Sequence, residues 1–226
     1  MPDSATTPVS FANRAITEPW TAKEPPVTRR GERTRQALVH AARTVFERDG
    51  FINSRLSDIT TEARCSSGSF YTYFESKEEV LVAVLESMQD DMMHPGIGRL
   101  PEGDESIRAV IEASNRAYIE AYRRNARLMM LLEQVATLDP MFAALRLERA
   151  QTFAERNSVK IKSLQEAGLA DTSLDPRTTS WALSSMISRL AYLGLVLGEP
   201  FDWDELVGTI TTLWLNALRV PEDRRG

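Results

Sequence analysis

Residues 54 to 79, SRLSDITTEARCSSGSFYTYFESKEE, contain the pattern of two short helices separated by a tight turn. Leu56, Ile59 and Ala63 recur at three- and four-residue spacing, so one face of the first helix is apolar and points inward. The turn follows at Arg64. Two short helices across such a turn form a helix-turn-helix unit, which is typical of DNA-binding proteins.

Ser66 begins the second helix, because a serine side chain can accept a hydrogen bond from a backbone N–H of the first turn. Phe70 and Phe74 lie four residues apart and are expected to point inward. The outward face then carries small, hydroxyl-bearing and aromatic residues and no carboxylate: Ser67, Gly68, Ser69, Tyr71, Thr72 and Tyr73. Such a face suits a groove lined with phosphates and base edges.

Ser76 and Glu79 have the spacing of a capping box, which fixes the start of the next helix. Lys77 lies in the first turn of that helix, where the helix dipole disfavours a cation. A phosphate docked on this helix end explains the lysine. The alternative is an exposed lysine that costs roughly a few tenths of a kcal/mol.

The stretch from Arg33 to Leu81 resembles the TetR family of bacterial transcriptional regulators. The residues that carry the resemblance are Arg33, Thr34, Arg35, Leu38, Ala41, Ala42, Val45, Phe46, Asp49, Gly50, Phe51, Asp58, Ile59, Ala63, Ser66, Gly68, Tyr71, Phe74, Ser76, Lys77 and Glu78. The resemblance implies an all-α protein, with an N-terminal three-helix DNA-binding module joined to a larger helical domain for ligand binding and dimerisation.

By this resemblance the second helix of the pair lies in the major groove, with Tyr71 and Lys77 on phosphates. The expected DNA-binding residues are Arg29, Arg30, Arg33, Arg55, Ser66, Ser67, Gly68, Ser69, Tyr71, Thr72, Tyr73 and Lys77. Arg64 departs from the family, because it replaces a usual turn glycine and either strains the turn or keeps a common backbone conformation. Arg55, Thr72 and Tyr73 also depart from it on the reading face, so the operator cannot be copied from a relative.

The charge is distributed unevenly along the 226 residues. The whole chain has a net charge of −5, which by itself gives no sign of nucleic-acid binding. Residues 29 to 77 hold nine Lys and Arg against six Asp and Glu, a net charge of +3. A mildly basic module therefore accompanies an acidic remainder.

Residues 1 to 28 are rich in Pro, Ser, Thr and Ala without periodicity, and we expect a disordered tail. Arg29, Arg30, Arg33 and Arg35 follow it directly. In the family an arm at this place can touch the DNA backbone or the minor groove. A solvated basic run before a helix is the alternative.

Cys65 is the single cysteine, so no internal disulfide framework exists, and a reducing cytoplasm is the expected location. It occupies the family's usual valine position and is expected to pack as a small hydrophobe, with redox sensing as the alternative. His40 and His94 have no partners at ligand spacing, and no HExxH, GxSxG, GxxxxGK or CxxC arrangement is present. We therefore expect no metal, no cofactor and no enzymatic activity.

We predict a DNA-binding domain at residues 29–78 and an effector-binding and dimerisation domain at residues 79–226. An apolar stripe from Val80 to Met92 links the two, and the Pro- and Gly-rich segment 94–103 interrupts the helical pattern. Further helices are expected from Asp104 to Arg124, from Leu128 to Leu138, from Asp139-Pro140 to Gly168, from Asp175-Pro176 onward and from Trp203 to Leu218.

The apolar run from Trp181 to Gly198 is interrupted by Ser184, Ser185, Ser188 and Arg189, and is too polar to cross a membrane. In the family the last two long helices of each subunit form a four-helix dimer interface. The expected interface residues are Trp181, Met186, Leu190, Leu193, Gly194, Leu197 and Trp214. Contacts within the chain are the alternative for each of them.

The helices that wall the family's ligand cavity carry apolar and amphipathic residues in this chain. The expected ligand-binding residues are Tyr118, Tyr122, Met129, Met130, Glu133, Phe142, Leu145, Phe153 and Tyr192. Together they imply a mostly apolar small-molecule effector, although any one of them alone fits ordinary core.

The expected function is a homodimeric repressor bound to a palindromic double-stranded DNA operator. By the resemblance, a hydrophobic effector in the body shifts the helix that begins at Ser76 and thereby releases the DNA. The alternative is a dimeric DNA-binding protein without a small-molecule effector, either constitutive or controlled by a protein partner.

Overall fold

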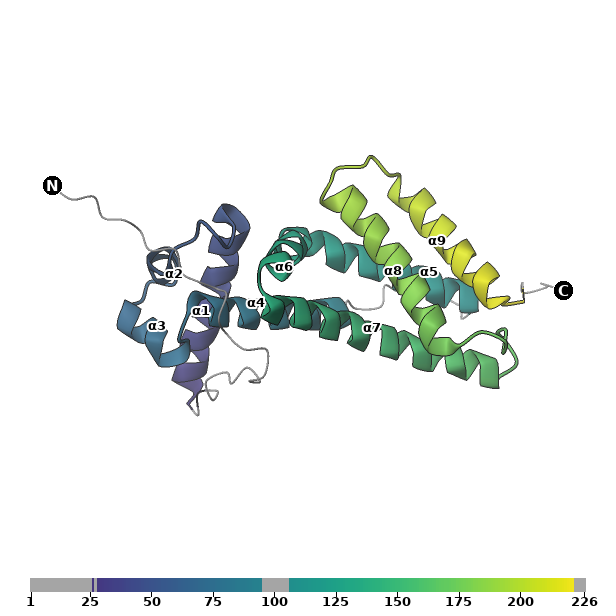
Figure 1. Cartoon of the computed structure of the whole chain (residues 1–226), viewed down its shortest axis with the longest axis horizontal. Coiled ribbons are helices and arrows are strands. Elements are labelled where there is room, and N and C mark those ends of the chain that lie inside the picture. The colour runs from purple at the N-terminus through teal and green to yellow at the C-terminus, as the bar shows by residue number, and fades with distance from the viewer. Residues whose placement is uncertain (1–25, 27, 95–105, 222–226) are drawn as a thin grey trace.

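The computed structural model describes residue 26, residues 28–94 and residues 106–221. This part of the chain forms helices and turns without a strand: α1 (Arg29–Asp49), α2 (Leu56–Glu62), α3 (Ser67–Tyr73), α4 (Lys77–Met93), α5 (Ile107–Arg124), α6 (Ala126–Leu138), α7 (Pro140–Glu166), α8 (Pro176–Leu195) and α9 (Trp203–Leu218). The predicted all-α fold is confirmed. Figure 1 shows α1 to α3 together at one end of the molecule, α5 to α9 at the other, and α4 running between them.

The helix starts follow the predicted capping signals. The Ser76 hydroxyl oxygen accepts a hydrogen bond from the Glu79 N–H at 3.2 Å, and Asp139 and Asp175 cap α7 and α8, each followed by a proline. The Glu79 carboxylate also accepts a hydrogen bond from the backbone N–H of Glu75.

The N-terminal module has its own fully buried apolar centre. Leu38, Val45 and Phe46 of α1, Ile59 of α2 and Phe70 of α3 are all 0% to 1% exposed. Burying each of these side chains stabilises the fold by about 1.5 to 3 kcal/mol. This core holds α2 and α3 in a fixed relation to each other and to α1.

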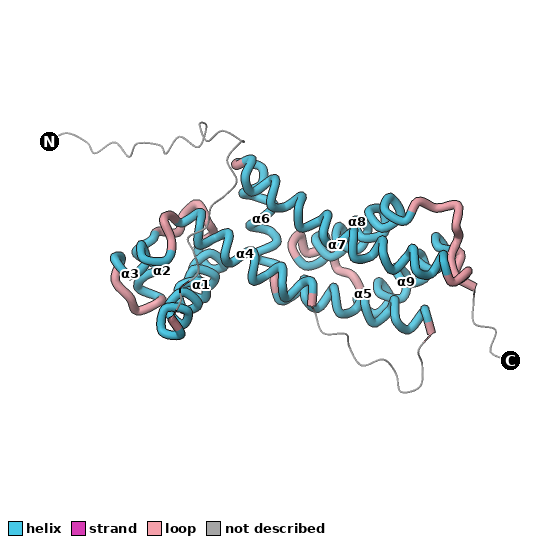
Figure 2. Tube along the Cα trace, turned by 90° about the horizontal axis from the view of Figure 1, so that it is seen from below, coloured by secondary structure: helices cyan, strands magenta, loops and turns pink. Residues whose placement is uncertain are grey.

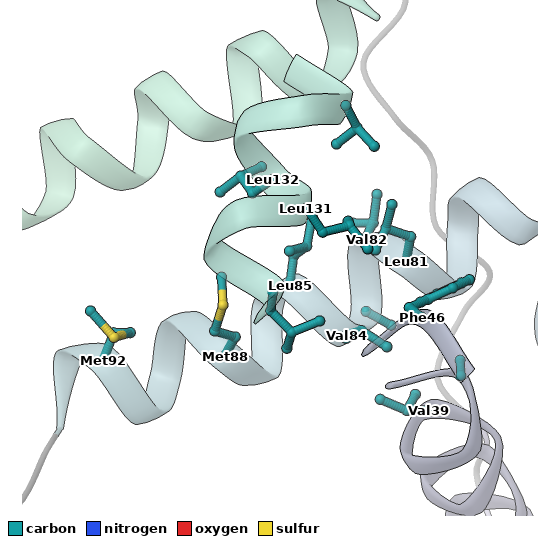
Figure 3. Close-up of a cluster of buried hydrophobic side chains, with 14 of the residues drawn as sticks. Val39, Phe46, Leu81, Val82, Val84, Leu85, Met88, Met92, Leu131 and Leu132 are labelled. Carbon is teal, nitrogen blue, oxygen red and sulfur yellow. The ribbon is translucent and has the colours of Figure 1, made fainter. Parts of the chain in front are cut away.

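Helix α4 belongs to both ends of the molecule. Figure 3 shows Val84 of α4 on the side of Val39 in α1, and Leu85 and Met88 on the side of Leu131 in α6. All five side chains are buried and belong to one continuous apolar cluster. A displacement of α4 therefore has to change contacts with the module and with the body together.

The body is built from α5 to α9, with α7 and α8 side by side and α9 against α5 (Figures 1 and 2). Buried polar bonds fix these pairs. The Ser180 hydroxyl of α8 donates to the Ala154 carbonyl of α7 at 2.6 Å, and the Asn115 amide of α5 donates to the Thr211 hydroxyl of α9 at 3.1 Å.

A polar cluster also joins the module to the body. Asp91 of α4 pairs with Arg124 at 2.9 Å and accepts from the Asn125 side chain at 2.6 Å, while Arg43 of α1 donates to Asn125 at 3.1 Å. The Arg124 guanidinium and the Asn125 amide hold the pKa of the Asp91 carboxyl below its usual range.

Some predictions fall outside the described residues. The predicted tail at residues 1–28 lies outside them, apart from residues 26 and 28. Segment 95–103 and the helix start expected at Asp104 also lie outside the described residues. The domain boundary predicted after residue 78 falls in the first turn of α4. In the described part of the chain, no helix has the length and apolar character needed to cross a bilayer.

Candidate nucleic-acid interface and ligand cavity

The outward face of α3 is open to solvent as the sequence predicts. Phe70 and Phe74 are 0% and 1% exposed, whereas Tyr71 is 53% exposed. Ser66, Ser67, Gly68 and Thr72 are exposed as well, and Ser69 and Tyr73 are half-buried. The face presents hydroxyl donors and acceptors without a carboxylate, and it is suited to phosphates and base edges.

The first turn of α1 lies beside this face. A methyl group added at Gly31 would stand 3.6 Å from the Tyr73 hydroxyl oxygen, which places the start of α1 next to the end of α3. Arg29, Arg30 and Arg33 are exposed there. Thr28 caps α1, so these arginines belong to the helix and not to a segment before it. Their place among the DNA-binding residues remains a prediction.

Arg55 occupies another helix start. It is exposed at the N-terminal cap of α2, and its backbone N–H donates to the Asp58 carboxylate at 2.9 Å. Its side chain is exposed to solvent, and its place among the DNA-binding residues remains a prediction.

The body contains a cavity of about 460 Å³ between α4, α5, α6, α7 and α8. This volume is in the range of small-molecule sites. Six of the nine predicted ligand-binding residues line it: Tyr118, Tyr122, Met129, Glu133, Phe153 and Tyr192. Aromatic rings form one wall, with the Tyr118 ring centroid 5.1 Å from that of Phe153 and 6.0 Å from that of Tyr122.

The other three predicted ligand-binding residues lie elsewhere. Met130 is 38% exposed, because α6 is apolar on several sides and adjacent residues of a helix point in different directions. Phe142 is buried in the first turn of α7, where its ring lies 6.1 Å from that of Phe51 in the module. Leu145, one turn along α7, packs against the main core. These three predictions are wrong for this cavity.

The serines and arginines of the lining were not predicted from the sequence. Ser184, Ser185 and Ser188 of α8 and Arg146 and Arg149 of α7 all face the cavity. The signal was present, because the serines interrupt the longest apolar run of the chain. A helix buried on several sides excludes such residues unless they line a polar space.

Burial changes the acidity of several cavity groups. It raises the pKa of the Tyr118 and Tyr122 hydroxyls above their usual value, so both keep their protons at neutral pH. Burial lowers the pKa of the Arg149 guanidinium to about 10, so this group remains charged at neutral pH. The Glu133 carboxylate pairs with Arg146 at 2.7 Å.

Residues 38–84 match the family model described as bacterial regulatory proteins, tetR family. The HTH-type transcriptional regulator YfiR of Bacillus subtilis is 32% identical over 104 residues, which are 46% of this chain and 48% of that protein. The HTH-type transcriptional regulator UidR of Escherichia coli is 24% identical over 148 residues, which are 65% of this chain and 74% of that protein.

The chain therefore carries a helix-turn-helix module that matches the TetR family, and it is similar to TetR-family transcriptional regulators. The fold of this chain also agrees with those of solved TetR-family structures over most of its length. A solved structure described as a TetR-family transcriptional regulator from Mesorhizobium loti aligns with a TM-score of 0.70 and 18% identity, covering 84% of this chain and 96% of that one. This chain spans about half the length of YfiR, so the similarity does not extend to that whole regulator.

Lys77 departs from the role expected by analogy with other TetR regulators. Its ammonium donates to the backbone carbonyls of Phe51 at 2.7 Å and Ser54 at 2.8 Å, and it stands 4.5 Å from the centroid of the Phe51 ring. These contacts join the start of α4 to the loop between α1 and α2. The geometry therefore favours an internal bridge over the expected phosphate contact.

Arg64, which stands at a usual glycine position of TetR proteins, has a φ of 53°. The sequence left open whether Arg64 is strained or keeps a common backbone conformation, and the structure shows the strained, left-handed one. This conformation costs a non-glycine residue about 1 to 2 kcal/mol. The turn is held by two backbone bonds, from the N–H groups of Arg64 and Cys65 to the carbonyls of Thr61 and Thr60.

Cys65 is half-buried against the apolar core, and burial raises the pKa of its thiol. This environment favours the packed role over redox sensing, because the reactive thiolate is disfavoured. His40 and His94 are exposed, and no group of three or more metal-binding side chains occurs within the described ranges.

The residues expected at the dimer interface divide into two groups. Trp181 lines the cavity, and Gly194 lies against the Phe201 and Trp203 rings, where an added methyl group would come within 2.5 Å of Trp203. Met186, Leu190 and Trp214 also pack against the core of their own chain. Leu193 is half-buried and Leu197 is 60% exposed. Contacts within the chain therefore account for Trp181, Met186, Leu190, Gly194 and Trp214, whereas Leu193 and Leu197 remain predicted interface residues.

Proposed function

We propose that this TetR-family protein is a ligand-responsive repressor in the cytoplasm. It binds a palindromic DNA operator as a homodimer and releases the operator when a small molecule fills the cavity. Residues 29–78 form the DNA-binding domain in this proposal, and residues 79–226 bind the effector and dimerise. The observation that carries it is the position of α4, which contacts the DNA-binding module at one end and lines the cavity at the other.

The two ends of α4 have distinct partners. At its start, Lys77 bridges to the loop before α2. At its end, Gln89, Met92 and Met93 line the cavity, and the Met93 carbonyl accepts a hydrogen bond from Arg156 of α7 at 2.5 Å. A ligand that displaces these last residues moves a helix packed against α1, so the cavity and α3 respond together.

On DNA, α3 enters the major groove and the arginines at the start of α1 contact phosphates on the same side. Tyr71 is 53% exposed and is placed to reach the backbone as well. The reading residues are Ser67, Ser69, Thr72 and Tyr73. A dimer places two such heads on successive major grooves, about 34 to 36 Å apart.

A second copy of this chain covers the outer side of α8 and α9. Leu197, just after α8, and Leu213 of α9 are 60% and 45% exposed. Gly208 of α9 has no atom within 4 Å of the position its Cβ would take, so nothing inside the chain requires a glycine there. A small residue permits a partner helix to approach closely, which supports this face as a two-fold interface.

The alternative is a dimeric DNA-binding protein without a small-molecule effector. A body packed solid would favour it, whereas a cavity of about 460 Å³ with polar groups in its wall favours the sensor.

The test is selection of binding sites from random duplexes, followed by titration of a small-molecule panel on the selected duplex. We expect two inverted half-sites, one dimer per site, and altered base preferences for Thr72→Ala and Tyr73→Phe. A single half-site bound by a monomer would overturn the dimeric reading. Failure of every compound to lower operator affinity would support the alternative.

A further inference from the structure

One charged group in the cavity wall has a buried nitrogen without a hydrogen-bond partner in the protein. Arg149 projects from α7, and its Nη1 atom is buried without a hydrogen-bond partner. Two other arginines have side-chain partners, since Arg43 donates to Glu47 and Asn125, and Arg146 pairs with Glu133. An arginine kept for structure has such bonds, because an unpaired buried charge destabilises the fold.

The cavity lining does not supply the missing counter-ion. It contains three arginines, of which Arg146 is paired and Arg189 lies over the Tyr192 ring at 5.3 Å. Its one carboxylate, Glu133, is the partner of Arg146. The groups whose charge influences Arg149 are Tyr118 and Tyr122, and both are neutral hydroxyls at neutral pH. Positive charge is therefore left uncompensated at this point of the wall.

The surroundings of Arg149 define the shape of a matching ligand. Tyr118, Phe153 and Met92 contribute apolar surface to the cavity wall, and Tyr122 and Ser188 contribute hydroxyl groups to it. A guanidinium offers two parallel N–H donors, which match the two oxygens of a carboxylate. This combination differs from the mostly apolar effector expected from the sequence.

We infer that the effector is an amphipathic carboxylic acid, whose carboxylate pairs with Arg149 and whose apolar part lies against the aromatic wall. The inference rests on the proposed sensor function and names its ligand class. The carboxylate of the ligand neutralises the Arg149 charge, which no carboxylate of the cavity lining does, so acids bind more tightly than neutral molecules of the same shape.

The test compares acids with their own amides, which match them in shape and lack the charge. Decanoate and decanamide, 2-naphthoate and 2-naphthamide, and 4-phenylbutyrate and its amide are titrated into the purified full chain by calorimetry. We expect at least one acid to bind about tenfold or more tightly than its amide. Arg149→Gln should remove this preference, whereas Arg149→Lys and the control Arg189→Gln should keep it. Amides that bind as well as acids in every pair, no binding by any acid, or a preference retained in Arg149→Gln would overturn the inference.

A second measurement needs no ligand. Arg149→Met should raise the melting temperature of the free protein, because it removes an unpaired buried charge. A lowered melting temperature would show that Arg149 stabilises the fold and would overturn the inference. Operator release is measured separately. An acid that binds through Arg149 without changing operator affinity would leave this inference standing and contradict the proposed sensor function.

Discussion

Lys77 gives the sharpest contrast between what the sequence suggests and what the structure contains. As a phosphate contact, it would matter for DNA affinity and little for folding. As a bridge, it joins α4 to the Phe51 and Ser54 carbonyls and would matter chiefly for folding. Substitution by alanine separates the two roles.

The magnitude follows from the contacts that are lost. A hydrogen bond to a charged group contributes about 1.5 to 3 kcal/mol. Lys77 is half-buried, so water can reach the two carbonyls after truncation, and its burial already lowers the pKa of the ammonium. We therefore expect a combined loss of about 2 kcal/mol for Lys77→Ala, or a fall of about 4 to 8 °C in melting temperature.

The assay pairs thermal unfolding with operator affinity measured against salt concentration, below both melting transitions. The bridge predicts the fall in melting temperature and an unchanged salt slope. Lys162→Ala is the control, since that side chain is 68% exposed and its substitution should change stability by about 0.5 kcal/mol at most. An unchanged melting temperature, with a salt slope reduced by about one, would refute the bridge and restore the phosphate contact.

Three further predictions concern stability and assembly. Arg64→Gly should raise the free energy of unfolding by about 0.5 to 1 kcal/mol, because relief of the left-handed conformation exceeds the entropy cost of glycine. Arg64→Ala should not raise the free energy of unfolding, since alanine does not relieve that conformation. Equal denaturant midpoints for the two variants would contradict this prediction. Asp91→Asn should cost under about 1 kcal/mol at neutral pH, since the carboxylate is partly exposed. The folded state lowers the pKa of Asp91, so its contribution to the free energy of unfolding is complete above the unfolded pKa of about 3.9 and disappears as pH falls through the folded pKa. The unfolding curves of the wild-type protein and of Asp91→Asn should therefore converge in acid. Gly194→Leu should lower the free energy of unfolding by about 1 to 3 kcal/mol, because the new side chain overpacks against Phe201 and Trp203, while the protein stays dimeric. Gly208→Leu should leave the stability of the fold unchanged and disrupt the dimer. Melting curves report the stability, and light scattering reports the dimer.

The helices were largely predictable from the sequence because their signals are local. Caps at Ser76, Asp139 and Asp175 and the glycine after α7 act within one helical turn. The inward positions of Phe70 and Phe74 follow from helical periodicity in the same way. These features required no knowledge of distant contacts.

The cavity was predictable only in part, because its lining depends on how five helices meet. The sequence placed Tyr118 and Phe153 correctly, but it could not show that Met130 faces solvent. It also could not separate an arginine with a partner from one without, as with Arg146 and Arg149. Those distinctions arise from tertiary contacts between residues far apart in the chain.

The same limit applies to the glycines. Gly194 and Gly208 are both helical glycines near the C-terminus, yet one is pressed against two aromatic rings and the other faces open space. Sequence spacing favoured Gly194 for the interface. In the structure, Gly208 is the glycine with open space beside it, so we now expect the partner helix to approach there.

Gly68 provides the most direct test that the outward face of α3 meets DNA. It has no positive φ, and a methyl group added there would meet only the Ser66 hydroxyl oxygen, at 3.8 Å. Nothing within the chain therefore requires glycine, and alanine should stabilise the helix by about 0.5 to 1 kcal/mol. The measurement is the operator dissociation constant of Gly68→Ala beside its melting temperature. The account predicts weakened operator binding, because the methyl group enters the space between backbone and DNA, with an equal or higher melting temperature. Unchanged operator affinity in a folded, dimeric Gly68→Ala protein would contradict the placement of α3 in the groove.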